Sequence, residues 1–193
     1  MKLVNLKVLC VTWGSDMILI VGLGNYGIEY AGTNHNAGFM ALDRLCDETG
    51  IEITKKGFKS LYYKGNLFGE SVVVAKPQTY MNLSGEAVVE LKNFFKPDKI
   101  LIVFDDYDLP YGTIRYRKNG SAGTHNGMRN IVALTGTQDI PRIKIGIKPE
   151  EQVYNLIDFV LAKVPKDYKE VFDKSLDEAY QKIKMFVEKK GEI

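Results

Sequence analysis

Short polar turns that carry imidazole, amide and carboxylate groups are the parts of this sequence best suited to chemistry. The two histidines, His35 and His125, each lie beside an asparagine in such a turn, and the acidic run Asp105 to Asp108 follows an apolar stretch. A carboxylate can orient an imidazole and stabilise its charged form, and a neutral imidazole can take a proton from water. The pattern therefore favours general-base hydrolysis by His35, with an aspartate partner and asparagine amides beside the developing charge.

Other reaction classes have weaker support. Ser84 is better placed to cap a helix, Ser121 lies in a glycine-rich loop, and the G-x-S-x-G pattern of serine esterases is absent. Asp105, Asp106 and Asp108 form a carboxylate cluster, but no histidine is near them in the sequence. We therefore expect no metal site, with magnesium at this cluster as the weaker alternative.

A glycine pattern suggests a dinucleotide-binding enzyme at first sight. Gly22, Gly24 and Gly27 match G-x-G-x-x-G directly after an apolar run. The residues from Tyr30 to Asn34 are turn-rich rather than helical, however, and the acids found about 20 positions on fall in a predicted helix instead of ending a strand. Nucleotide binding is therefore a minor alternative.

Apolar periodicity predicts strands that alternate with helices. Strands are predicted at residues 17–23, 61–68, 71–75, 99–104, 113–117 and 142–147, and helices at 37–49, 84–95, 127–134 and 165–190. This alternation is typical of an α/β fold, here a single-domain sandwich with a mostly parallel twisted central sheet flanked by helices. Because ligands bind beyond the carboxyl ends of parallel strands, we expect the polar turns to meet there.

Composition agrees with one soluble domain. The chain has 193 residues, of which 45% are hydrophobic and 26% charged. No run approaches the about 20 apolar residues that span a bilayer, and the N-terminal apolar segment is too short for a secretory signal. With only Cys10 and Cys46, we expect no disulfide framework, and a cytoplasmic location is predicted.

Positive charge is concentrated in one stretch, although the net charge is only +2. Between residues 115 and 148 the single acid is Asp139. The basic residues of this stripe are Arg115, Arg117, Lys118, Arg129, Arg142, Lys144 and Lys148. Such a stripe indicates a polyanionic partner, although an ordinary solvated surface can have the same composition.

Six segments, taken in order along the chain, match one known pattern. They are IVGLGNYGIEYAGTNHNAGF at 20–39, KPQTYMNLSGEAV at 76–88, VFDDYDLPYG at 103–112, GSAGTHNGMRNI at 120–131, RIKIGIKP at 142–149 and FVLAKVP at 159–165. Together they resemble the bacterial-type peptidyl-tRNA hydrolases, from about Met17 to the C-terminus. The resemblance implies an esterase that frees the 3′ end of tRNA from a peptide or an N-blocked amino acid and so recycles tRNA from stalled peptides. It also implies no cofactor, peptidyl-tRNA as the partner, and a monomer.

The resemblance implies catalytic roles for three residues. His35 would be the general base, and Asp105 would hold His35 and favour its active form. Asn25 would contact the start of the peptide and help to select blocked over free aminoacyl-tRNA.

The resemblance also implies a binding channel for the tRNA end and the peptide backbone, lined by Tyr30, Tyr80, Asn82 and Asn126. Tyr80 stands where an aromatic residue is usual, consistent with stacking on a base. Arg117 and Lys144 correspond to a basic pair that grips the tRNA 5′-phosphate; lysine at 144 keeps the charge but lacks the bidentate fork of arginine.

Three departures from the family pattern carry expectations of their own. Tyr26 replaces a usual proline, which predicts a less rigid turn and a less fixed Asn25. Asn34 replaces a common arginine, which predicts less positive charge near the site. Thr124 replaces a glycine, which predicts strain if the loop needs a positive φ.

Residues 1–16 precede the point where the family pattern begins, so we expect an extension that is dispensable for function, followed by a catalytic domain at residues 17–193. Two further functions remain open. A non-catalytic RNA-binding module would bind tRNA without cleaving the ester, and a branch of the same fold that acts in chloroplast RNA splicing shares most of the signatures.

Overall fold

A mixed β-sheet forms the centre of the protein. The computed structural model describes residues 16–193, and in this part of the chain seven strands pair in the order β2-β3-β4-β1-β5-β7-β6. The four central strands, β4, β1, β5 and β7, run parallel, whereas β2, β3 and β6 add antiparallel edges. The strands are β1 Ile18–Gly22, β2 Lys55–Gly57, β3 Ser60–Leu67, β4 Glu70–Pro77, β5 Lys99–Pro110, β6 Ile114–Arg117 and β7 Arg142–Lys148.

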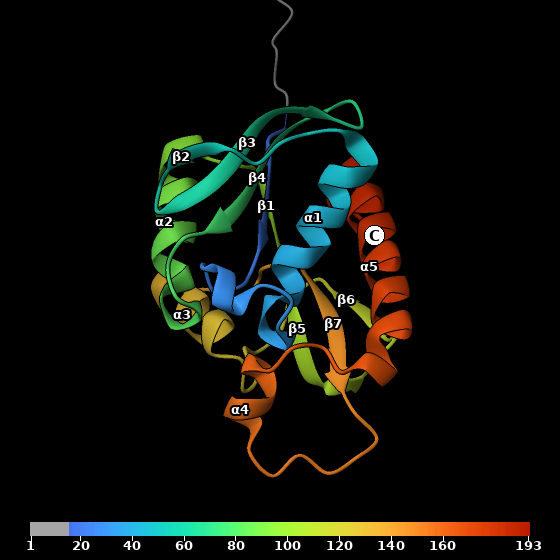
Figure 1. The fold of residues 1–193 in the computed structure, drawn as a ribbon. Helices are drawn as coiled ribbons and strands as arrows, with labels where there is room; N and C mark the ends of the chain where they lie inside the picture. The colour runs from blue at the N-terminus through green and yellow to red at the C-terminus, as the bar shows by residue number, and fades with distance from the viewer. Residues whose placement is uncertain (1–15) are drawn as a thin grey trace, which may run out of the picture.

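Helices cover both faces of this sheet (Figure 1). One face is covered by α1 and α5, and the other by α2 and α3. The helices are α1 Ala37–Thr49, α2 Ser84–Phe95, α3 Asn126–Thr135, α4 Leu156–Leu161 and α5 Lys166–Glu188, with short 3-10 helices η1 Ile28–Tyr30, η2 Asn34–Asn36 and η3 Met81–Leu83. The predicted single-domain α/β sandwich is therefore confirmed, with the parallel strands at its centre.

The sequence of β1 explains why this strand lies in the middle. Side chains alternate between the two faces of a strand. Ile18 and Ile20 pack into the core beneath α1 and α5, while Leu19 and Val21 pack into the core beneath α2 and α3. A strand buried on both faces must be apolar at every position, which is what the run ILIVG provides.

Close packing accounts for the glycine pattern that resembles a nucleotide-binding motif. A Cβ atom on Gly22 would lie 2.4 Å from the carbonyl oxygen of Gly38, and one on Gly24 would lie 2.6 Å from the ring of Phe39. After Gly27 the chain forms only the three-residue η1 rather than an α-helix. Gly22 and Gly24 let α1 pack closely against the end of β1 and the residues after it, so these two glycines have a packing reason.

Some local predictions were wrong. The acidic residues from Asp105 to Asp108 lie within β5, which continues beyond residue 104 because it pairs with β7. Ser84 does not cap α2; it is the first helical residue, and its hydroxyl donates to the carbonyl oxygen of Met81. The short β2 and α4 were not predicted.

No helix of residues 16–193 is long and apolar enough to cross a membrane. Cys10, Trp13 and nearly all of the expected N-terminal extension lie outside the described residues.

Candidate active site

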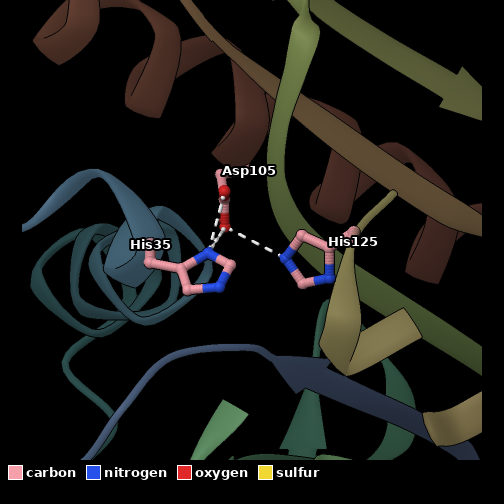
Figure 2. A group of neighbouring side chains, drawn as sticks. All are labelled: His35, Asp105 and His125. Carbon is pink, nitrogen blue, oxygen red and sulfur yellow. Dashed lines mark hydrogen bonds and ion pairs between the residues drawn. The ribbon is translucent and has the colours of Figure 1, made fainter. Parts of the chain in front are cut away.

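Two histidines and one aspartate meet beside the central strand β5, just beyond the carboxyl end of β1 (Figure 2). His35 lies in η2, directly before α1; Asp105 lies in β5; and His125 is the residue that precedes α3. His35 Nδ1 lies 3.0 Å from each carboxylate oxygen of Asp105, and His125 Nε2 lies 3.2 Å from Oδ1 of the same carboxylate. One buried carboxylate therefore holds two imidazoles.

The electrostatics of this group follow from burial and mutual contact. Burial alone would lower the pKa of His35, but the charge of Asp105 and the hydrogen bond to it outweigh that effect and raise the pKa above its ordinary value. Burial alone would raise the pKa of Asp105, but the charges and hydrogen bonds of His35 and His125 hold it well below its usual range. Asp105 is therefore an anion, and it stabilises the protonated form of His35.

The second ring nitrogen of His35 is available for chemistry. Nδ1 faces Asp105, so Nε2 points away from the carboxylate (Figure 2) and makes no hydrogen bond within residues 16–193. The His35 side chain is 12% exposed, which leaves room for a water molecule to approach it. A buried carboxylate behind an accessible imidazole is an arrangement that can activate water.

His125 is the member of this group to which the sequence reasoning gave no role. Its ring packs against His35 with centroids 4.9 Å apart, and against Phe104 at 4.7 Å. The available signal was that it is the only other histidine and, like His35, lies beside an asparagine. Its distance in sequence from Asp105 concealed the contact, and the statement that no histidine is near the acidic cluster was wrong in space.

The three side chains also meet the spacing of a metal site, because their ligand atoms lie within 4.8 Å of one another. The tautomer of His125 argues against that use. Its Nδ1 accepts a hydrogen bond from the backbone N–H of Met128, so the ring proton lies on Nε2, and the nitrogen that faces Asp105 has no lone pair for a metal. The arrangement thus fits hydrogen bonding better than metal binding.

Hydrogen bonds from two neighbouring segments hold Asn25. Its backbone N–H donates to Asn36 Oδ1, and its carbonyl oxygen accepts from Asn36 Nδ2. Its side-chain Oδ1 accepts from the backbone N–H of Met81, at 2.8 Å. Neighbouring segments therefore hold both the backbone and the side chain of Asn25, and the effect of Tyr26 on the rigidity of the turn stays a prediction.

Aromatic rings gather next to the hydrogen bond between Asn25 and Met81. The rings of Tyr26 and Tyr80 have centroids 4.9 Å apart, and Tyr30 meets Tyr80 edge-on at 6.2 Å. Tyr26 is 39% exposed and Tyr80 is 45% exposed. The two rings form an exposed aromatic surface beside Asn25 and Met81.

A cavity lies beside the two histidines and is walled by several elements. β5 and α3 line it together with α4, whose apolar residues Leu156, Ile157 and Val160 face it. Asn126 and Lys144 also line it, whereas Asn25 lines a separate cavity. Asn82 is exposed in η3, which packs against α3. The structure thus brings His35, Asp105, Asn126 and Lys144 to one cavity, whereas Asn25 lies at another and Arg117 pairs with Arg142 at the start of β7.

The residues of the basic stripe have different environments in the structure, and they do not form one continuous charged surface. Arg142 is 1% exposed and donates to the carbonyl oxygens of Ile140, Ser121 and Gln138, so it belongs to the interior and not to a charged surface. Lys144 forms an ion pair with Asp106 at 2.6 Å. Arg117 is exposed at the end of β6 and has no ion pair within the described part of the chain.

Two other departures from the family pattern have structural outcomes. Asn34 is fully buried: its side chain accepts from the hydroxyl of Tyr111 and donates to the carbonyl oxygen of Phe159, next to the cavity wall at α4. Thr124 has no positive φ, because Gly123 takes the left-handed conformation in this loop. The expected strain at Thr124 was therefore wrong.

An α/β sandwich with an imidazole–carboxylate pair in a cavity is the architecture of an enzyme, and comparison with known proteins identifies the family. The peptidyl-tRNA hydrolase family model matches residues 19–192. A peptidyl-tRNA hydrolase of Desulforamulus reducens is 46% identical over 174 residues, covering 89% of this chain and 83% of the relative. A peptidyl-tRNA hydrolase of Brevibacillus brevis is 48% identical over 151 residues, covering 77% of this chain and 80% of the relative.

A solved structure agrees. The crystal structure of peptidyl-tRNA hydrolase from Acinetobacter baumannii superimposes with a TM-score of 0.83 at 37% identity, covering 91% of this chain and 90% of that chain. The chain therefore belongs to the peptidyl-tRNA hydrolase family, and its reaction is the hydrolysis of peptidyl-tRNA.

Proposed function

We propose that His35 is the general base of this hydrolysis. Neutral His35 takes a proton from water through Nε2, and the water oxygen attacks the ester carbonyl that joins the peptide to the terminal ribose. Asp105 stabilises the imidazolium as it forms. The supporting observation is the contact of both Asp105 oxygens with His35 Nδ1, which fixes the ring and leaves Nε2 to face the substrate side.

Asparagine amides supply the remaining polar groups of the proposed mechanism. Asn25 uses its Oδ1 to accept from Met81, so its NH₂ group is the part left to contact a substrate carbonyl at the start of the peptide. That contact would favour blocked over free aminoacyl-tRNA. An amide such as that of Asn82 would stabilise the oxyanion, while Asn126 lines the cavity beside His35.

The tRNA is held outside the cavity in this proposal. Exposed Tyr80, with Tyr30 at its edge, offers a ring on which a base can stack. Arg117 supplies free positive charge for a phosphate, whereas Lys144 contributes less because Asp106 already neutralises it. Reaction of a tRNA substrate points to a cytoplasmic protein, and we expect it to act as a monomer without a cofactor.

The test is the release of blocked amino acid from N-acetyl-aminoacyl-tRNA, measured beside unblocked aminoacyl-tRNA. We expect cleavage of the blocked form alone. His35→Ala should lose about 10²–10⁴-fold in kcat with little change in tRNA binding. Tyr154→Ala is the control, since Tyr154 is 90% exposed and does not line the cavity.

Three results would count against the proposal. A His35→Ala enzyme within a fewfold of the wild type would remove His35 as the base. Cleavage of both substrates would remove the selective role of Asn25. Intact tRNA binding with no cleavage by the wild type would favour a non-catalytic RNA-binding module.

A further inference from the structure

The N-terminus of α3 fixes the proton of His125. As the residue before the helix, His125 accepts the backbone N–H of Met128 at Nδ1, a bond of 3.2 Å. A ring nitrogen that accepts a hydrogen bond carries no proton, so the neutral ring must carry its proton on Nε2. That N–H points at Oδ1 of Asp105, 3.2 Å away. The fold therefore makes His125 a permanent hydrogen-bond donor to Asp105.

The same carboxylate oxygen serves both imidazoles. Asp105 Oδ1 lies 3.0 Å from His35 Nδ1 and also accepts from His125, while Oδ2 contacts His35 alone. The Asp105 side chain is 3% exposed and that of His125 is 9% exposed. In such a site the carboxylate is stabilised mainly by the protein groups that face it, and each donor accounts for a large share of that stabilisation.

We propose that His125 is a positioning residue for the reaction: its Nε2–H fixes the plane of Asp105 and draws part of the carboxylate charge away from His35. The proposal rests on the role of His35 as general base. When His35 is neutral, the Asp105 charge is uncompensated and the bond from His125 stabilises it most. When His35 is protonated, the ion pair already compensates that charge. His125 therefore favours neutral His35, the form that can accept a proton from water.

The other charged groups near His35 in residues 16–193 come from β5 and β7. β5 contributes Asp105, with Asp106 and Asp108 farther along the cavity; β7 contributes Lys144; and α4 contributes apolar side chains only. Asp106 and Lys144 form an ion pair with each other. On the far side of η2, Tyr111 donates its hydroxyl proton to Asn34 rather than to the histidine. Asp105 and His125 are thus the titratable side chains in direct contact with the His35 ring among residues 16–193.

Substitutions at position 125 can separate the donor from the helix cap. Asparagine and serine are good residues before a helix and can accept the Met128 N–H, but they are too short to reach Asp105. Glutamine places an NH₂ group the same number of bonds from Cβ as His125 Nε2, so it can keep the donation. The full chain carrying His125→Asn, His125→Ser or His125→Gln therefore provides matched variants, with thermal unfolding as the check of folding.

The chain has only two histidines, so the ring nitrogens can be followed by long-range ¹H–¹⁵N NMR without crowding. In the wild type we expect the His125 ring to carry its proton on Nε2. In His125→Asn and His125→Ser the titration midpoint of His35 and the acid limb of kcat/KM should both rise by about 0.5–1 pH unit. On the acid limb this lowers kcat/KM by about three- to tenfold, while the alkaline plateau stays within a fewfold. His125→Gln should remain close to the wild type.

A purely structural role would give a different result. If the Asn and Ser variants lose activity equally at every pH and the His35 midpoint does not move, the proposal is overturned. A proton on Nδ1 of wild-type His125 would overturn it as well. Failure of the proposed function has a separate signature: a wild-type rate without a limb that follows the His35 titration, together with an active His35→Ala enzyme.

Discussion

Substitution of Asp105 by asparagine changes one atom and removes one negative charge at the centre of the site. Oδ1 accepts from both His35 and His125, whereas Oδ2 contacts His35 alone. Because the His125 N–H needs an acceptor, the amide oxygen should take the place of Oδ1 and the NH₂ group that of Oδ2. His35 Nδ1 then faces one acceptor and one donor, and its imidazolium no longer has a counter-charge.

The magnitude follows from the contact distance and the burial. A carboxylate and an imidazolium about 4 Å apart between charge centres, at an effective dielectric constant of about 20, attract each other by about 4 kcal/mol. The Asp105 side chain is 3% exposed, so solvent screening removes little of this energy. At about 1.4 kcal/mol for each tenfold change in rate, kcat should fall by about 10³-fold.

The direction of the pH effect is an independent check. In the wild type Asp105 outweighs the effect of burial and raises the pKa of His35, so the acid limb of kcat/KM should lie above 6.5. Without the carboxylate, burial is the remaining influence and lowers that pKa. The acid limb of kcat/KM for Asp105→Asn should therefore move to lower pH. The loss of kcat/KM relative to the wild type should then be smaller at acid pH than at mildly alkaline pH.

The assay measures kcat/KM for N-acetyl-aminoacyl-tRNA as a function of pH, over the pH range in which both the tRNA and the enzyme stay folded. Asp139→Asn is the matched control, since it also replaces a carboxylate by an amide, but at an exposed position that does not line the cavity. An Asp105→Asn enzyme within a fewfold of the wild type on the alkaline plateau would refute the reasoning.

Two more predictions concern binding and the N-terminal segment. Arg117→Ala should raise KM for tRNA substrates and flatten the increase of KM with salt, because a phosphate contact releases counterions; a wild-type KM that ignores salt would contradict this. A chain that begins at Met17 should unfold at the same temperature and turn over substrate at the same rate as the full chain. Its new α-ammonium can pair with Asp98, which already accepts the Met17 N–H at 2.8 Å, and loss of folding or activity would show that residues before Met17 are needed.

Strong local patterns made much of the fold predictable. The fully apolar run of β1 and the helical spacing in α1 and α2 predicted these elements to within a residue or two of their ends. Short elements were missed because their own sequences hardly favour them. α4 has six residues, fewer than an isolated helix needs to be stable, and β2 has three.

The side-chain partners were harder to predict than the elements. Ser84 and Arg142 have sequence contexts that suit a helix cap and a charged surface, yet the side chains of both donate to backbone carbonyl groups. Lys144 kept its charge but gained Asp106 as a partner from a neighbouring strand. In each case the deciding contact comes from a segment that is distant in sequence or from a turn whose geometry the sequence does not state.

The sequence by itself determined the fold class and the family and pointed to His35 and Asp105 as candidate site residues, because apolar periodicity and ordered motifs are local properties of the chain. Only the tertiary structure decided that His125 shares the carboxylate of Asp105 and that Asn36 and Met81 hold Asn25. Residues 20 to 70 positions apart meet there because parallel strands end at one edge of the sheet. A hydrogen bond depends on distances of a few tenths of an ångström, and these are set by the packing of whole elements rather than by neighbours along the chain.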